Sequence, residues 1–125
     1  MPLSRRRAET PVTFTHIVTF KWRNDSGADA VIAEALQNLV STMDGVHSYL
    51  CGPDAGMTAG AYDFAVVGRF DDRDAFIAYR DHPEHQRILN EMILPNLESR
   101  TVVQLEDTVQ LEDTAQLEDT AQLEA

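Results

Sequence analysis

Residues 13–22, with the sequence TFTHIVTFKW, decide the fold of this chain. Two sets of side chains alternate along the segment, which indicates a β-strand, because successive side chains of a strand point to opposite faces of a sheet. Ile17 stands among threonines in one set, which predicts a face that is only half covered. The other set is expected to face the core and consists of Phe14, His16, Val18, Phe20 and Trp22.

Residues 12–23 are therefore expected to form the first strand, and the pattern beyond them predicts alternating helices and strands. Asp71 and Asp72 suit a helix start, since a side-chain oxygen there accepts from free backbone N–H groups. Pro83 is expected to interrupt the helical region that follows, because proline lacks the N–H that a helix interior needs. The predicted elements are a helix over 28–43, strands over 46–51 and 61–70, a helical region from 72 to about 95, and a strand over 99–105.

This order, β-α-β-β-α-β, is the split βαβ or ferredoxin-like arrangement. It predicts an α+β domain with a four-stranded antiparallel sheet and helices on one face. Ile17, Ala65 and Val67 would then lie on the other face of the sheet. A partly apolar sheet face without cover favours a homodimer formed through that face, and hence a dimeric α/β barrel.

The charge of the chain is concentrated in a repeat near its C-terminus. The 125 residues carry a formal net charge of −11. Seven acidic side chains and no basic one stand in residues 106–125, where a six-residue unit (VQLEDT and AQLEDT) recurs. We therefore divide the chain into a flexible leader over 1–11, a domain over 12–105 and an acidic tail over 106–125, which is expected to be disordered.

The same composition excludes several function classes. A negative balance argues against nucleic-acid binding, which needs a basic face, and against docking on anionic membranes. One cysteine, Cys51, allows no internal disulfide. No apolar run approaches the ~20 residues that span a bilayer. A cytoplasmic protein is expected.

Three histidines and a tyrosine are the candidates for chemistry. His16 stands in the middle of the first strand on its core-facing side, and Tyr79 precedes the turn His82-Pro83-Glu84-His85. In a ferredoxin-like fold the first strand is central and lies beneath the helices, so these side chains could meet there. Histidine exchanges protons near neutral pH. The alternative is structural: a hydrogen-bonded core histidine at 16 and a helix-ending residue at 82.

A metal site is an alternative interpretation of the same histidines. His16, His82 and His85 would make a three-histidine ligand set. However, His-Pro-x-His is not a usual zinc motif, and the single cysteine rules out a multi-cysteine site. Neither a metal nor another cofactor is expected.

The strand Thr15-His16-Ile17-Val18-Thr19-Phe20-Lys21-Trp22 and the His-Pro-x-His turn resemble the Dabb family, the stress-responsive α/β-barrel domain. The resemblance covers about residues 13–105, and the two motifs are more specific as a pair than alone. It implies a ferredoxin-like monomer whose sheet packs against the sheet of a second copy.

The resemblance also implies a reaction. A plant polyketide cyclase of this family performs an intramolecular aldol condensation without a metal. Its catalytic positions correspond to His16, Tyr79 and His85, which implies His85 as the base, Tyr79 as hydrogen-bond donor to the carbonyl oxygen, and His16 as the residue that orients the substrate or holds the tautomer of His85. A small hydrophobic or aromatic ligand would contact Phe14, Leu36 and His82. Leu36 departs from the cyclase, which has a pocket tyrosine near that position.

Two other functions remain open at this point. The first is a non-catalytic, stress-associated dimer with structural histidines, in which replacing His85 by alanine would strongly lower the melting temperature. The second is a relative of the small dimeric-barrel monooxygenases, which share the fold but for which no residue here points to oxygen chemistry.

Overall fold

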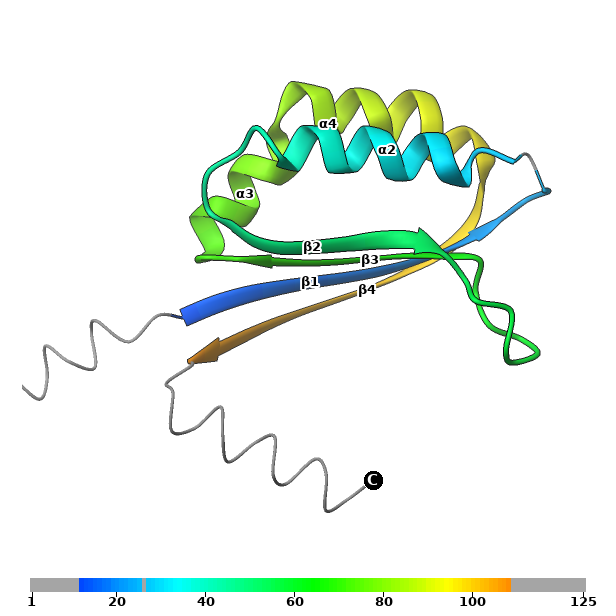
Figure 1. Ribbon diagram of the computed structural model, residues 1–125, viewed down its shortest axis with the longest axis horizontal. Coiled ribbons are helices and arrows are strands. Elements are labelled where there is room, and N and C mark those ends of the chain that lie inside the picture. The colour runs from blue at the N-terminus through cyan, green and yellow to red at the C-terminus, as the bar shows by residue number, and fades with distance from the viewer. Residues whose placement is uncertain (1–11, 26, 109–125) are drawn as a thin grey trace, which may run out of the picture.

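The computed structural model describes residues 12–25 and 27–108, which form a four-stranded sheet with helices packed on one side (Figure 1). The predicted leader over 1–11 and residues 109–125 of the predicted tail lie outside this range. The elements are β1 (Val12–Trp22), α2 (Asp29–Val40), β2 (Val46–Pro53), β3 (Phe64–Phe70), α3 (Arg73–Asp81), α4 (Pro83–Ile88), a π-helical turn (Leu89–Ile93), a 3₁₀ turn (Leu94–Asn96) and β4 (Leu97–Thr108).

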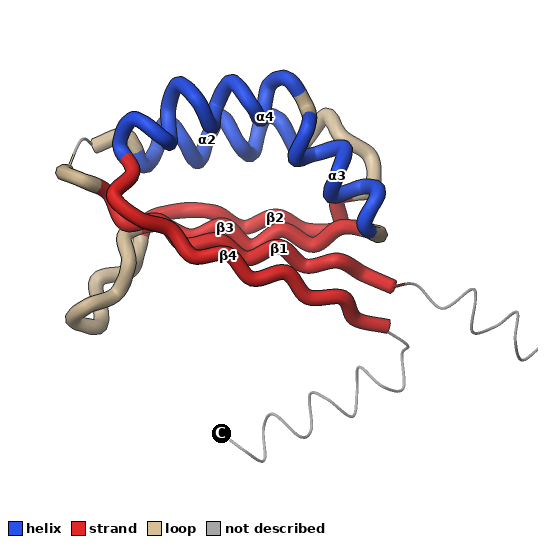
Figure 2. Tube along the Cα trace, turned by 180° about the vertical axis from the view of Figure 1, so that it is seen from behind, coloured by secondary structure: helices blue, strands red, loops and turns tan. Residues whose placement is uncertain are grey.

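The strands lie in the order β2-β3-β1-β4, and every neighbouring pair is antiparallel. β1 is thus central, with β3 on one side and β4 on the other. Helices α2, α3 and α4 all cover the same face, as the view from behind also shows (Figure 2). The predicted ferredoxin-like α+β architecture is confirmed.

Some element ends differ from the prediction. β4 runs from Leu97 to Thr108, beyond the expected 99–105, because it pairs with β1 along its whole length. Residues 106–108 of the predicted tail therefore belong to the sheet. α2 stops at Val40, and the hydroxyl of Thr42 donates to the carbonyl oxygen of Leu39 at 2.7 Å. Such local bonds compete with the helical ladder and favour its end.

The second helical region begins and breaks where local chemistry predicts. The Asp72 side chain accepts a hydrogen bond from the backbone N–H of Ala75 and caps α3. At His82 the backbone is extended, and Pro83 then opens α4 as its first residue. Proline suits that position, because its fixed φ is helical and its missing N–H would have no partner there. The helical axis changes direction at this break, as α3 and α4 show (Figure 1).

The covered face of the sheet carries the core. Phenylalanines and valines of β1 and β3 pack against α2, α3, α4 and the π-helical turn, and alternate residues of each strand are buried. Fourteen apolar side chains are buried: Phe14, Val18, Phe20, Ile32, Leu36, Leu39, Val40, Phe64, Val66, Phe70, Phe76, Tyr79, Ile88 and Ile93.

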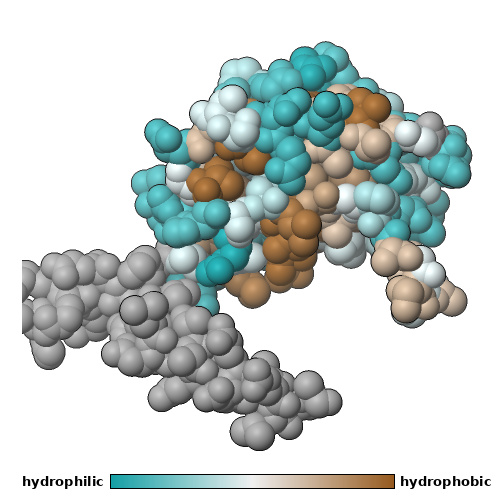
Figure 3. All heavy atoms as spheres, in the orientation of Figure 1, coloured by the Kyte–Doolittle hydropathy of each residue, from teal (hydrophilic) through white to brown (hydrophobic). Residues whose placement is uncertain are grey.

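The opposite side, called here the open face, is covered by no helix among the described residues. The strand registers place Leu50, Val67, Ile17 and Val103 side by side in one apolar row that crosses all four strands. Leu50 is 71% exposed and Val103 50%. Apolar side chains reach the surface along the sheet side of the molecule (Figure 3). The loop between β2 and β3 projects on this same side (Figure 1).

Candidate functional site

A cavity of about 330 Å³ lies between the covered face of the sheet and the helices. Its floor comes from β1, β3 and β4, and its roof from α2, α3, α4 and the π-helical turn. Most of the lining is apolar, with a group of polar side chains among it. The lining residues are His16, Val18, Phe20, Leu36, Val66, Phe76, Tyr79, Arg80, His85, Gln86, Leu89, Ile93, Arg100, Val102 and Gln104.

His16 projects into this cavity from the centre of β1. Its ring centroid lies 4.8 Å from that of Phe76 and 6.4 Å from that of Tyr79. The amide nitrogen of Gln104 lies 3.2 Å from Nδ1 of His16. An amide nitrogen can only donate, so Nδ1 accepts and the proton of the neutral ring is on Nε2. The His16 side chain is therefore a hydrogen-bond donor to the cavity.

The environment keeps the His16 ring neutral at physiological pH. Burial, helped by the nearby charges of His85 and Arg100, lowers the pKa of His16 from 6.5 to about 4. Desolvation disfavours the charged imidazolium, and neighbouring positive charges act in the same direction.

His85 enters the cavity from α4, with its ring centroid 4.4 Å from that of Tyr79. Its Nδ1 lies 3.0 Å from the backbone carbonyl oxygen of Arg80. A carbonyl oxygen only accepts, so Nδ1 carries the proton and Nε2 keeps a free lone pair. Burial lowers the pKa of His85, which keeps the ring in this neutral form. The backbone of Arg80 thus fixes the tautomer, rather than His16, which was one of the two roles expected for that residue.

Tyr79 is 2% exposed, and its hydroxyl is engaged by a second tyrosine. The Oη atoms of Tyr49 and Tyr79 are 2.6 Å apart. Burial is the main cause that raises the pKa of Tyr79, to about 12, while the bond to Tyr49 opposes that rise. Burial and the bond to Tyr79 both raise the pKa of Tyr49. Either hydroxyl of the pair can be the donor of this bond.

Sequence reasoning missed Tyr49. The residue stands on β2, whose register places it opposite Gly68 on the covered face. The alternation of Tyr49 with Cys51 indicated that both side chains lie on one face of the strand. Tyr79 is thirty residues further along the chain, however, and the sequence pattern does not predict a contact between the two tyrosines.

The cavity brings together four of the six predicted site residues. His16, Tyr79, His85 and Leu36 line it, whereas Phe14 and His82 do not. Phe14 stacks on Phe76 with ring centroids 4.6 Å apart and borders a neighbouring hollow.

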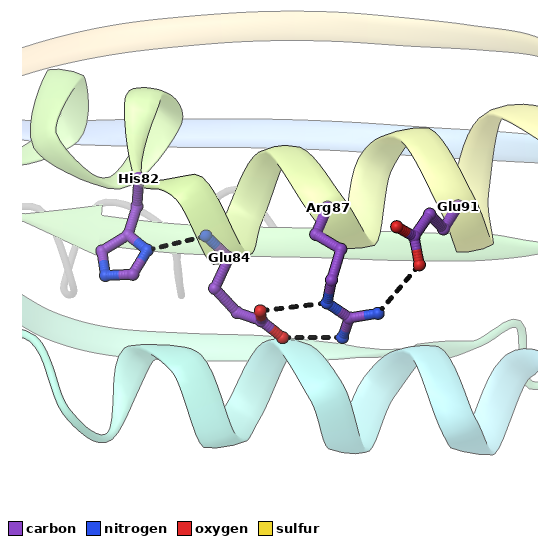
Figure 4. A network of polar contacts seen from close by, with 4 residues as sticks. All are labelled: His82, Glu84, Arg87 and Glu91. Carbon is purple, nitrogen blue, oxygen red and sulfur yellow. Dashed lines mark hydrogen bonds and ion pairs between the residues drawn. The ribbon is translucent and has the colours of Figure 1, made fainter.

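His82 serves the local structure of the helix. Its Nδ1 accepts the backbone N–H of Glu84 at 3.0 Å and so caps α4. Glu84 in turn pairs with Arg87, and Arg87 with Glu91, so that the four side chains follow one side of the helix (Figure 4). His82 borders a groove between α2 and α4. The structural interpretation of this histidine thus accounts for its placement.

Four polar lining residues were not anticipated: Arg80, Gln86, Arg100 and Gln104. Gln86 donates to the same Arg80 carbonyl oxygen that holds His85. Arg100 and Gln104 come from β4, which the sequence predicted only as a strand. The alternation of positions 100, 102 and 104 indicated that they share one face of the strand. The register of β4 against β1 decides that this is the covered face.

Within residues 12–25 and 27–108, no group of three or more His, Cys, Asp or Glu side chains is placed to hold a metal ion. Two histidines, His16 and His85, line the cavity, whereas His82, the third residue of the predicted ligand set, lies outside it. In the same part of the chain, no helix has the length and apolar character needed to cross a membrane.

Comparison with known proteins places the chain among small domains of this architecture. A family model described as the stress responsive A/B barrel domain (Dabb) matches residues 14–107. A stress-response A/B barrel domain-containing protein of Arabidopsis thaliana is 32% identical over 75 residues, which are 58% of this chain and 67% of that protein.

Solved structures give the same picture. A dimeric ferredoxin-like protein of unknown function from Thermobifida fusca matches with a TM-score of 0.68 at 38% identity, over 76% of this chain and 91% of that one. A hydroxynitrile lyase from Passiflora edulis matches with a TM-score of 0.65 over 81% of this chain and 98% of that one. The lyase is 18% identical, so its likeness shows the fold alone.

Proposed function

This chain belongs to the stress responsive A/B barrel domain (Dabb) family, and from that premise we propose that it binds a small, largely apolar carbonyl compound in its cavity and catalyses proton transfer on it. The observation that carries the proposal is His85, a neutral imidazole in a largely apolar cavity whose tautomer leaves Nε2 without a proton.

In this proposal His85 Nε2 removes a proton from the carbon next to the substrate carbonyl. The electron pair of the broken C–H bond moves onto the carbonyl oxygen and forms an enolate. A positioned base of this kind contributes roughly 10²–10⁴-fold to rate. The lowered pKa makes His85 a weaker base, but it favours the neutral, reactive form of the ring.

Two hydrogen-bond donors would stabilise the enolate oxygen in this proposal. If Tyr49 donates to Tyr79, the proton of Tyr79 is left for the substrate. His16 carries its proton on Nε2 and is a second, neutral donor. Fixed donors of this sort act where the negative charge develops and need no reorganisation during the reaction.

For a polyketide-like substrate, the enolate carbon would attack a second carbonyl group of the same molecule. One carbon–carbon bond forms, and the new alkoxide takes back the proton that His85 holds, so no oxidant or reductant is consumed. The hydroxynitrile lyase of Passiflora edulis has the same fold. Aldol-type cyclisation is the reaction that we favour for this chain.

We also propose that the protein is a homodimer formed through the open face. The Thermobifida fusca protein is described as dimeric. The row of Leu50, Val67, Ile17 and Val103 offers the apolar surface that a second sheet would cover. Two sheets packed face to face would form the dimeric barrel, with one cavity on the outer side of each sheet.

The test uses acetophenone as a probe with one exchangeable position next to its carbonyl. In D₂O, the rate of methyl deuteration is followed by proton NMR with the full-length protein. The wild type is expected to accelerate the exchange, and His85→Gln to lower the acceleration by 10² or more.

His47→Gln is the matched control, because His47 is exposed and pairs with Asp71, with Nε2 and Oδ1 2.6 Å apart, away from the cavity. It should leave the exchange unchanged. Melting curves of both variants are recorded alongside. If His85→Gln exchanges as fast as the wild type, or only melts at a lower temperature, the proton-transfer proposal is wrong and the non-catalytic dimer takes its place.

A further inference from the structure

We propose that Arg100 binds a carboxylate at the β4 side of the cavity, so that the ligand is an apolar acid with its carbonyl group toward the histidines and its carboxylate at the arginine. This inference rests on the proposed function, because it names the substrate class of the same cavity.

The register of β4 places Arg100 on the cavity side. Arg100 pairs with Phe20, and Gln104 pairs with His16, both of which are cavity residues of β1. Positions 100, 102 and 104 therefore share the covered face, and all three line the cavity. Gln104 bonds to His16, so one strand holds both the histidine partner and the arginine.

Two arginines line the cavity, and Arg100, unlike Arg80, has no carboxylate partner among the described residues. Arg80 also lines the cavity, but its guanidinium forms two bonds to Asp81, at 2.9 and 3.2 Å. Arg73 is held in the same bidentate way by Glu106. Arg100 lines the cavity and is an exposed residue, so its guanidinium is accessible to a bound ligand. A ligand would supply the missing anion.

Spacing along the strand sets the shape of that ligand. Gln104 stands four positions after Arg100, which is about 13 Å between Cα atoms in a strand, and a long arginine side chain can cross part of that distance. Val18, Val102 and Ile93 are among the apolar residues of the lining. The ligand thus needs an apolar body of a few bond lengths between its two polar ends.

The chemistry of arginine favours a carboxylate in particular. The planar guanidinium donates two parallel N–H bonds that match the two oxygens of a carboxylate. Among the described arginines of the lining, Arg100 alone has no carboxylate partner, which suits a ligand with a single negative charge. The positive charge of Arg100 also contributes to the low pKa of His16. A carboxylate bound to Arg100 would offset that charge and raise the pKa of His16.

The experiment compares an acid with its uncharged amide. The probes are 5-oxo-5-phenylpentanoate and 5-oxo-5-phenylpentanamide, which share the phenyl ketone and differ in charge. Dissociation constants are measured at pH 7 by NMR, from the ring C–H signals of His16 and His85. The wild type is expected to bind the acid about tenfold or more tightly than the amide.

Arg100→Gln should remove that preference and leave the affinity for the amide unchanged. Arg23→Gln is the control, because Arg23 is exposed, does not line the cavity, and has no carboxylate partner among residues 12–25 and 27–108. It loses the same charge and should keep the preference.

The outcomes separate the two proposals. If the wild type binds acid and amide equally, with shifts at His16 and His85, the carboxylate inference is overturned while the cavity remains a ligand site. If Arg100→Gln weakens both probes alike, the arginine only shapes the cavity, and the inference is again wrong. If neither probe shifts the two histidines, the proposed function itself fails.

Discussion

The two faces of the sheet are built from the same strands, yet they differ in almost every property. On the covered face, β1 presents His16 to a largely apolar cavity that lies beneath the helices. On the open face, one residue further along, β1 presents Ile17 in an apolar row with no cover among the described residues. A shift of one position thus separates a candidate catalytic site from a candidate interface.

Both faces thus carry a candidate function, so burial alone does not identify the functional face of the sheet. The covered face uses burial to control protonation, since it lowers the pKa of both cavity histidines. The open face exposes apolar side chains to water, which favours their burial against a partner. The predictions below test each side of this comparison.

The largest effect is expected from a charge in the centre of the open-face row. Ile17→Glu would bury an unpaired carboxylate in the proposed interface, at a cost of about 3–5 kcal/mol. The dimer should dissociate into folded monomers at micromolar concentration, as measured by analytical ultracentrifugation. Val31→Glu, on the exposed side of α2, is the control and should stay dimeric. A dimeric Ile17→Glu protein would place the interface elsewhere.

A pair of glycines compares the two faces directly. A Cβ at Gly68 would lie 3.0 Å from Phe70 Cε1 and 3.1 Å from Tyr49 Cδ1, whereas a Cβ at Gly52 would have nothing within 4 Å. Phe70 is fully buried and has little room to move. Gly68→Ala should therefore lower the free energy of unfolding by about 1–3 kcal/mol.

Gly52→Ala, on the open face, should be neutral or slightly stabilising, because alanine reduces the entropy of the unfolded chain. Urea unfolding of the two variants checks the difference. Equal effects would show that the covered face is looser than its packing indicates.

The tyrosine pair offers a smaller test of the covered face. Tyr49→Phe removes the hydroxyl that bonds Tyr79 and leaves a buried hydroxyl without that partner. We expect a loss of about 1–2 kcal/mol in unfolding free energy. Tyr62→Phe is the matched control, since the Tyr62 hydroxyl has no hydrogen bond to the part of the chain that the structure describes. A loss of the same size in both variants would contradict the buried pair.

The smallest effect, counted per pH unit, is expected when the unfolding free energy is measured at decreasing pH. His16 and His85 have lower pKa values in the folded protein than in the unfolded chain, so the unfolded chain binds protons first as pH falls. Stability is complete above pH 6.5 and decreases toward pH 4, by at most about 1.4 kcal/mol per pH unit for each histidine. Solvent that still reaches the rings reduces this slope.

His16→Asn should flatten the curve between pH 6.5 and 4. Unfolding free energies in urea at pH 7, 6 and 5 provide the measurement. Identical pH dependence in the wild type and His16→Asn would show that the His16 ring is not kept neutral by its surroundings.

Local rules were sufficient for much of the fold. Alternation along residues 13–22 predicted both the strand and the direction of its side chains, because the period of a strand is two. Asp72 and Pro83 marked a helix start and a helix break, because capping and the missing N–H act within a few residues. From the resulting order of elements followed the sheet, the covered side and the meeting of His16 with His85.

The remaining features depend on contacts between distant segments. The register of β4 against β1 decides that Arg100 and Gln104 face the cavity, and a shift by one residue would turn both to the open face. The bond from Tyr49 to Tyr79 joins β2 to α3. The break at His82 brings His85 back to the Arg80 carbonyl and so selects its tautomer.

The sequence by itself determined the elements, their order, and which alternate residues of β1 face the helices, because these follow from periods of two and 3.6 residues and from the chemistry of aspartate and proline. Only the tertiary structure decided which polar groups meet in the cavity, which nitrogen of each histidine carries the proton, and that Arg100, unlike Arg80, lines the cavity without a carboxylate partner among the described residues. Those properties depend on distances between atoms that are far apart in the chain, and no local pattern encodes them.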